Sequence, residues 1–70
     1  MEAKLKKSFA LNLQKTRNDK RLTQAEVAEG ANLSVNHYAK IERGEVFPGI
    51  DTLARITKSL DAHSSDILPF

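Results

Sequence analysis

Two helix signals in the middle of the chain stand very close together, and this closeness limits the possible folds more than any other feature. Thr23, followed three residues later by Glu26, is the capping-box pattern of a helix start. Ser34 can cap the start of a second helix, which Gly44 would end. Only residues 32–34 connect the two helices, so the chain must turn between them at a large angle.

The face that these two helices share must contain side chains of small or medium size. A larger residue in place of Ala28 would push the helices apart. Suitable side chains are present at six positions: Val27, Ala28, Ala31, Leu33, Tyr38 and Ile41. With this face buried, the opposite face of the second helix projects from the domain, and a helix presented in this way fits a DNA major groove of about 12 Å.

Apolar periodicity predicts three more helices around the same core. One precedes residue 18 and has apolar side chains four residues apart: Leu5, Phe9 and Leu13. Another follows Pro48 and has its inward-facing side chains at helical spacing: Ile50, Leu53, Ile56, Thr57 and Leu60. Residues 66–68 can form a last short helix. The sequence therefore predicts an all-α fold of five helices in a single domain, residues 1–70.

Length and composition limit the class of protein. A chain of 70 residues buries only about 60% of the surface of its unfolded form, so a partner chain would help to stabilise it. The absence of cysteine excludes disulfides and thiolate metal sites. Residues 1–7 are charged and no apolar run follows them, so no signal peptide is expected. The apolar runs are far shorter than the roughly 20 residues of a membrane span. We expect a soluble, cytoplasmic protein.

Positive charge is concentrated in the N-terminal third. Residues 1–21 contain seven of the 11 lysines and arginines and two acidic residues, a balance of +5. The remaining residues include four basic and seven acidic ones, a balance of −3. Such asymmetry suits a basic flank that meets polyanionic phosphate. The alternative is an ordinary solvated helix face.

Several motifs together resemble the phage repressor and Cro-type helix-turn-helix family, which includes xenobiotic-response-element-like transcriptional regulators. A Thr-Gln-x-Glu helix start and an Ile-Glu-Arg-Gly helix end carry the likeness; the matching segments are residues 23–28, 33–34, 38–44, 48 and 52–53. The likeness extends from residue 9 to residue 68, and in length the chain is similar to restriction–modification controllers. It implies a compact, lambda-repressor-like domain of five helices whose helix-turn-helix core spans residues 24–43.

The resemblance also implies that one helix face reads DNA bases. The positions concerned are Val35, Asn36, His37 and Lys40. The chemistry agrees for Lys40, which can donate to guanine O6 and N7, and for Asn36, which can pair with adenine N6 and N7. Val35 could contact only a thymine methyl group. An ordinary solvated helix face is again the alternative.

A second group of residues is expected to contact DNA phosphates. The resemblance assigns this role to Gln24, at a helix N-terminus that also favours an anion. A purely local cap is the alternative for Gln24. Ser34, Arg43 and Lys15 complete the expected phosphate contacts.

Arg17 and Glu42 have a different expected role. Members of the family pair the matching arginine and glutamate across the first and third helices, so we interpret these two residues as a structural ion pair. A carboxylate on the DNA side would otherwise repel phosphates. Breaking the pair, if it is partly buried, would leave an uncompensated charge.

The chain departs from the family pattern at the turn and after the third helix. Asn32 stands where glycine is usual, and it tolerates the same left-handed backbone. Val46 and Phe47 stand where many members have polar or basic residues. They could shield the core, contact the DNA backbone or join a dimer contact.

Apolar residues near the C-terminus suggest a dimer interface formed by Ile67, Leu68 and Phe70, with Leu11 as an outlier on the first helix. Short members of the family commonly dimerise through their last two helices. A two-fold dimer places two helices about 34 Å apart, one DNA turn, which suits a palindromic site. Closure of the monomer core is the alternative for Ile67 and Leu68.

The predicted function is a sequence-specific, homodimeric transcriptional regulator that binds double-stranded DNA at a palindromic operator, with RNA polymerase as a candidate further partner. The alternative is an antitoxin-like protein-interaction module on the same fold. No catalysis is expected, because the chain has no thiol and no glycine-rich phosphate loop, and His37 and His63 are far apart. We expect no metal, cofactor or small-molecule ligand.

Overall fold

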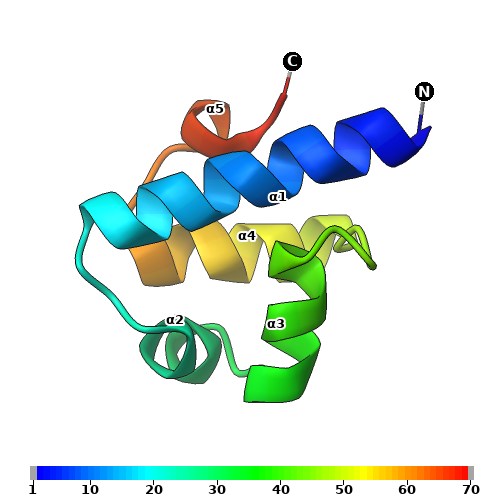
Figure 1. The fold of residues 1–70 in the computed structure, drawn as a ribbon. Coiled ribbons are helices and arrows are strands. Elements are labelled where there is room, and N and C mark those ends of the chain that lie inside the picture. The colour runs from blue at the N-terminus through cyan, green and yellow to red at the C-terminus, as the bar shows by residue number, and fades with distance from the viewer. Residues whose placement is uncertain (1, 70) are drawn as a thin grey trace.

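The computed structural model describes residues 2–69, and it has the five helices that the sequence predicted. They are α1 (Glu2–Asp19), α2 (Gln24–Gly30), α3 (Val35–Glu42), α4 (Ile50–Leu60) and α5 (Ser64–Ile67). No strand occurs within this range. Helix α5 lies on one side of α1, and α2 and α3 lie on the other side (Figure 1).

All five helices contribute to one apolar core. Its buried members are Phe9, Leu13, Val27, Ala28, Ala31, Tyr38, Ile41, Leu53, Ile56, Leu60 and Ile67. Partly buried side chains surround them: Leu22, Leu33, Val46, Ala62 and Leu68. All six side chains predicted for the shared face of α2 and α3 belong to one of these two groups, so the interpretation of that face is confirmed.

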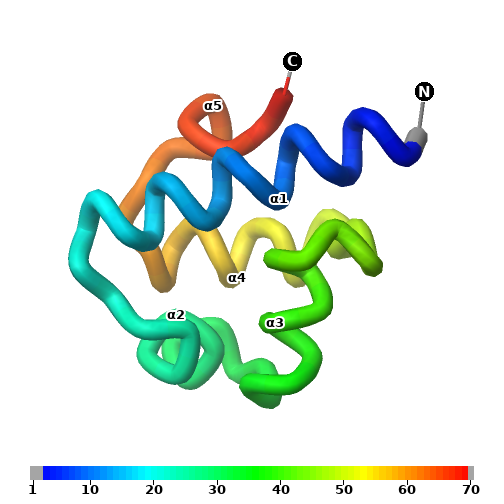
Figure 2. Tube along the Cα trace, viewed as in Figure 1, coloured from blue at the N-terminus to red at the C-terminus, as the bar shows by residue number. Residues whose placement is uncertain are grey.

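The chain turns between α2 and α3 at Asn32, whose φ is 58°. The Leu33 N–H donates to the Ala28 carbonyl at 2.8 Å, and the Asn32 N–H donates to the Glu29 carbonyl at 3.1 Å. These two bonds end α2 in a Schellman motif. Asparagine tolerates the left-handed backbone that the motif needs, because its short polar side chain lowers the steric cost. The trace in Figure 2 follows the resulting sharp turn into α3.

The predicted caps of both helices are present. The Thr23 Oγ1 accepts from the Glu26 N–H at 3.0 Å, and the Glu26 Oε1 accepts from the Thr23 N–H at 2.8 Å, which completes the capping box. The Ser34 Oγ accepts from the His37 N–H at 3.0 Å and caps α3. These caps fix where the two short helices begin.

Helix α2 packs very closely on α4 at Gly30. An added Cβ at Gly30 would lie 2.3 Å from the Ser59 Oγ. That hydroxyl donates to the Val27 carbonyl at 2.9 Å, so it cannot move away without losing a hydrogen bond. Glycine at position 30 therefore permits the close approach of α2 to α4.

Two apolar residues predicted to face the core are exposed instead. Ile50 is 84% exposed and Leu5 is 40% exposed. Ile50 is the first residue of α4, one turn before the buried Leu53, and Leu5 lies one turn before the buried Phe9. Both helices therefore begin before the edge of the core, although the apolar periodicity continues.

The prediction that Ile67 lies at a dimer interface is wrong. Ile67 is fully buried in the monomer core, and its carbonyl accepts from the Asn12 Nδ2 at 3.3 Å, which attaches α5 to α1. Leu68 is partly buried against the same core. Phe70, the third predicted interface residue, lies outside the described residues. In a chain this small, α5 is needed to close the core.

The loop before α4 covers the core with two apolar side chains. The ring centroids of Phe47 and Phe9 are 4.9 Å apart at an interplanar angle of 59°, a tilted arrangement that aromatic pairs favour. Val46 packs against the core beside them. Of the three roles left open for Val46 and Phe47, the structure supports shielding of the core.

Candidate nucleic-acid interface

Helix α3 divides into a buried face and an exposed face. Tyr38, Ile41 and Glu42 are buried, whereas all four candidate base-reading residues are exposed: Val35, Asn36, His37 and Lys40. Lys40 follows Asn36 by four residues and His37 by three, so these three side chains are neighbours on one face of the helix. Val35 is the first residue of α3 and lies at the end of this face.

A buried ion pair fixes the inner face of α3 to α1. The Arg17 Nε donates to the Glu42 Oε2 at 2.5 Å, and the Arg17 Nη2 donates to the Glu42 Oε1 at 3.1 Å. The two side chains are only 15% and 3% exposed. The Arg17 Nη1 also donates to the Leu22 carbonyl at 2.8 Å. The pair expected from the family resemblance is thus present, and it joins α1, α3 and the chain entering α2.

The charge on Glu42 is stabilised by its neighbours despite burial. Burial opposes ionisation of this carboxyl, but its polar neighbours, Arg17 first among them through its hydrogen bonds and its charge, outweigh that effect and hold the pKa of Glu42 below its usual range. Burial also raises the pKa of the neighbouring Tyr38 hydroxyl far above its usual range, and the Glu42 carboxylate adds to this shift. Glu42 is therefore a charged structural residue.

Gln24 is connected to this pair and is partly accessible. Its Nε2 donates to the Glu42 Oε1 at 3.1 Å, and the side chain is half-buried at the start of α2. An amide nitrogen carries two hydrogens, so one N–H remains to donate elsewhere. The structure thus gives Gln24 a contact with α3 in place of the purely local cap that the sequence left open, and its second N–H can still donate to a phosphate.

Arg43 ends α3 and is exposed, but it already has a partner. Its Nε donates to the Glu45 Oε2 at 2.5 Å, with side chains that are 55% and 51% exposed. Sequence reasoning did not single out Glu45. The spacing of two residues between Arg43 and Glu45 gives no helical or strand signal, so the pair becomes visible only once the turn after α3 is folded.

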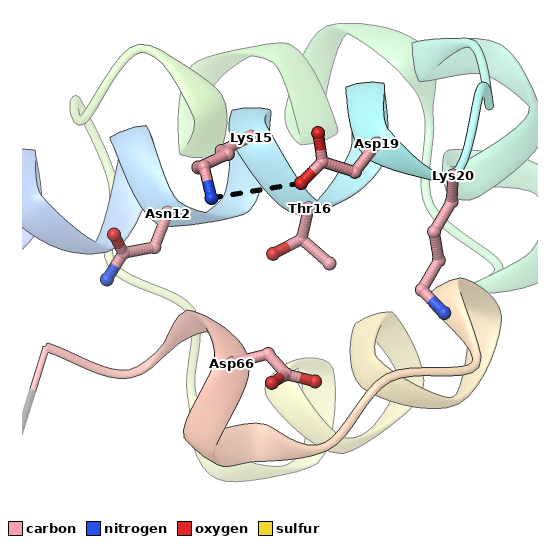
Figure 3. Close-up of a pocket in the computed structure, with 6 residues that line it drawn as sticks. All are labelled: Asn12, Lys15, Thr16, Asp19, Lys20 and Asp66. Atoms are coloured by element: carbon pink, nitrogen blue, oxygen red, sulfur yellow. Dashed lines mark ion pairs between the residues drawn. The ribbon is translucent and has the colours of Figure 1, made fainter.

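Lys15 is not brought together with the α3 residues. It pairs with Asp19 on α1 at 3.9 Å and lines a shallow hollow between α1 and α5 that also includes Asp66 (Figure 3). Helix α5 and helix α3 lie on opposite sides of α1 (Figure 1). Lys15 therefore faces a different side of the molecule from the candidate interface.

Two features are absent from the described part of the chain, a metal-binding cluster and a membrane-spanning helix. Residues 2–69 contain no group of three or more histidine, aspartate and glutamate side chains that could hold a metal ion. Within the same residues, no helix combines the length and the apolar character that a membrane crossing requires.

A sharply turned helix pair whose second helix is exposed along one face defines a helix-turn-helix domain. The HTH_3 helix-turn-helix family model matches residues 13–67, and the chain belongs to this family of DNA-binding regulators. A search of curated protein sequences finds no match.

Solved structures of regulators share this fold. The clp gene regulator ClgR from C. glutamicum is 28% identical with a TM-score of 0.84, over 90% of this chain and 82% of that chain. An HTH_3 family transcriptional regulator from Vibrio cholerae is 30% identical with a TM-score of 0.88, over 96% of this chain and 38% of that chain. The restriction-modification controller protein C.AhdI from Aeromonas hydrophila is 21% identical with a TM-score of 0.85, over 90% of this chain and 96% of that chain, which supports the fold alone.

Proposed function

We propose that this protein regulates transcription by binding a palindromic DNA operator as a homodimer, with α3 of each subunit in the major groove. One observation carries the proposal: α3 buries one face in the core and exposes Asn36, His37 and Lys40 together on the other. A helix anchored in this way can enter a groove of about 12 Å without the fold being disturbed.

Each exposed side chain has a definite chemistry toward base edges. Lys40 donates to guanine O6 and N7, and Asn36 pairs with adenine N6 and N7. His37 adds a donor or acceptor beside Lys40. Val35 offers only apolar contact, which suits a thymine methyl group. On this proposal we expect a guanine and an adenine in each half-site.

Phosphate contacts fix the register of α3 in the groove. We assign them to Gln24, Ser34 and Arg43. Gln24 has one amide N–H beyond the bond to Glu42, and the Ser34 hydroxyl accepts from His37 and still has its own hydrogen to donate. We leave Lys15 out, since its hollow faces the other side of α1.

Dimerisation would use apolar surface near α5. Leu11 is 57% exposed on α1 and directly precedes Asn12, whose amide contacts the Ile67 carbonyl. Leu68 directly follows α5 in the chain, and Phe70 is two residues further on. With Ile67 in the core, we place the interface on Leu11, Leu68 and Phe70. Two-fold symmetry would then present two α3 helices to half-sites about 34 Å apart.

Selection of bound duplexes from a random DNA pool, at about 50 mM and about 200 mM salt, tests the proposal. The expected result is a palindromic consensus with half-sites one helical turn apart. An Asn36→Ala/Lys40→Ala variant, altered only on the exposed face of α3, serves as the control and should recover no consensus. If the unaltered protein also yields only salt-sensitive background, a protein-partner role such as that of an antitoxin replaces the proposal.

A further inference from the structure

Glu45 places a negative charge at the end of α3, beside two cations that the proposed function directs to DNA. Its backbone is held in place: the Glu45 N–H donates to the Lys40 carbonyl at 3.0 Å, and the Gly44 N–H donates to the Ile41 carbonyl at 3.1 Å. Together with the φ of 76° at Gly44, these bonds form a Schellman motif. The backbone of Glu45 is therefore fixed at the end of α3, and its carboxylate stays close to that helix.

That carboxylate neutralises Arg43. The Arg43 Nε donates to the Glu45 Oε2 at 2.5 Å. This hydrogen bond holds the pKa of Glu45 below its usual range, and the charge of Lys40 acts in the same direction. Glu45 is therefore ionised at neutral pH, and the Nε–H of the Arg43 guanidinium is already bonded to it before any DNA arrives.

The fold gives no reason for an acid at this position. Both side chains of the pair are about half exposed, and exposed pairs contribute little to stability. A negative charge near the C-terminus of a helix is also unfavourable toward the helix dipole. The backbone bonds that end α3 depend on the Glu45 N–H and would be made equally well by glutamine.

We infer that Glu45 is an internal counterion, which competes with DNA phosphate for Arg43 and so weakens the binding of this protein to DNA of any sequence. The inference rests on the proposed function, in which Arg43 contacts a phosphate. DNA must displace the carboxylate from Arg43 or share the guanidinium with it. In either case Glu45 stays close to the phosphates and repels them.

The Glu45→Gln variant tests this role by binding to a random-sequence duplex over a series of salt concentrations. At low salt we expect about fivefold tighter binding, the factor for one pair of unit charges near 4 Å in water. One more cation becomes available to phosphate, so the slope of log K against log salt should steepen by about 0.9.

Asp61→Asn is the matched control, because it changes the net charge by the same amount. Asp61 follows the last residue of α4, whereas Glu45 lies in the loop before that helix. Its φ is 53°, which asparagine also tolerates. At about 0.1 M salt such a remote charge is largely screened, so its effect on affinity should be well below that of Glu45→Gln.

A double-mutant cycle with Arg43→Gln tests whether Glu45 acts through Arg43. We compare the change in log affinity caused by Glu45→Gln in the two backgrounds. In the Arg43→Gln background this change should be less than about half of that in the parent protein. An unchanged effect there would overturn competition for Arg43, and equal or weaker binding by Glu45→Gln in the parent background would overturn the inference entirely. If the parent protein binds no duplex at about 50 mM salt, the proposed function fails and this inference fails with it.

Discussion

The Arg17 guanidinium on α1 donates to both carboxylate oxygens of Glu42 on α3, at 2.5 and 3.1 Å, and Gln24 on α2 donates to one of these oxygens at 3.1 Å. Three helices thus meet at one buried carboxylate. The orientation of α3, which the proposed function depends on, is therefore set by an ion pair as well as by apolar contacts.

Replacing Arg17 by alanine should destabilise the domain by about 3 kcal/mol, because it leaves the Glu42 charge buried without its main partner. For a domain of this size, that loss corresponds to a fall in Tm of more than about 10 °C. Thermal unfolding followed by circular dichroism measures it. Lys15→Ala, which removes the exposed pair with Asp19, should change stability by less than about 0.5 kcal/mol and is the control. Equal effects of the two variants would contradict a structural role for Arg17.

Glu42 should make the domain sensitive to acid. Its pKa is lowered in the folded state from an ordinary value of 4.5, so below that value the unfolded chain takes up a proton before the folded protein does. The stabilisation is complete above the ordinary pKa and is lost as pH falls through the lowered one. Urea unfolding between about pH 7 and about pH 3 measures this loss. The Glu42→Gln variant should show a weaker pH dependence; an identical profile would assign the acid sensitivity to other carboxylates.

Gly30→Ala should destabilise the domain by about 1–3 kcal/mol, because the added methyl group would meet the Ser59 hydroxyl at 2.3 Å. Helix propensity alone predicts the opposite sign, a gain of about 1 kcal/mol. Gly49→Ala is a useful comparison, since nothing lies within 4 Å of an added Cβ there. In a Ser59→Ala background the penalty of Gly30→Ala should shrink. A more stable Gly30→Ala variant would mean that α2 can move away from α4 at little cost.

Lys40→Ala should cost about 1–3 kcal/mol of binding to the selected operator and relax the preference at one base pair per half-site. Fluorescence anisotropy with operator and random duplexes measures both affinities. Lys58→Ala, which removes a lysine from the exposed surface of α4, should have much less effect on either duplex. An equal loss on operator and random DNA would show that Lys40 contacts phosphate and does not read a base.

Leu11→Gln should weaken self-association without destabilising the folded monomer, because Leu11 is largely exposed in the monomer. Phe70→Ala should act in the same direction. Sedimentation velocity at several protein concentrations measures both effects. Ile67→Ala provides the contrast: a buried side chain in the core, its truncation should cost about 2–5 kcal/mol of folding stability. Unchanged sedimentation of both the Leu11 and Phe70 variants would place the dimer contact elsewhere.

Local signals in the sequence predicted most of the fold. The capping box at Thr23, the cap at Ser34 and the left-handed turn at Asn32 involve residues close in the chain, so their patterns can be read directly. The close approach of Gly30 to Ser59 joins residues far apart in the chain, and no periodicity reveals it. The apolar periodicity also predicted that Leu5 and Ile50 face the core, but both are exposed. An apolar pattern does not show where the core ends.

The candidate site was predictable to a similar extent. The exposed positions on α3 followed from which residues the core buries. Lys15 was grouped with the phosphate-contacting residues because the sequence does not show which side of α1 each lysine occupies. The position of α5 in the fold shows that Lys15 lies on the side away from α3. Ile67 was misassigned because a small core and a dimer interface require the same apolar residues. Glu45 was missed since its significance depends on how the chain turns after α3.

The division of α3 into two faces has a consequence for how such proteins can diverge. Asn36, His37 and Lys40 are exposed and take no part in the apolar core, so exchanges among them should change stability by no more than about 0.5 kcal/mol. Mutation can thus explore new operator preferences almost free of a folding penalty, whereas the residues that orient α3 cannot vary in the same way. A gene duplicate of this chain could acquire a different target within a few substitutions while keeping the same scaffold.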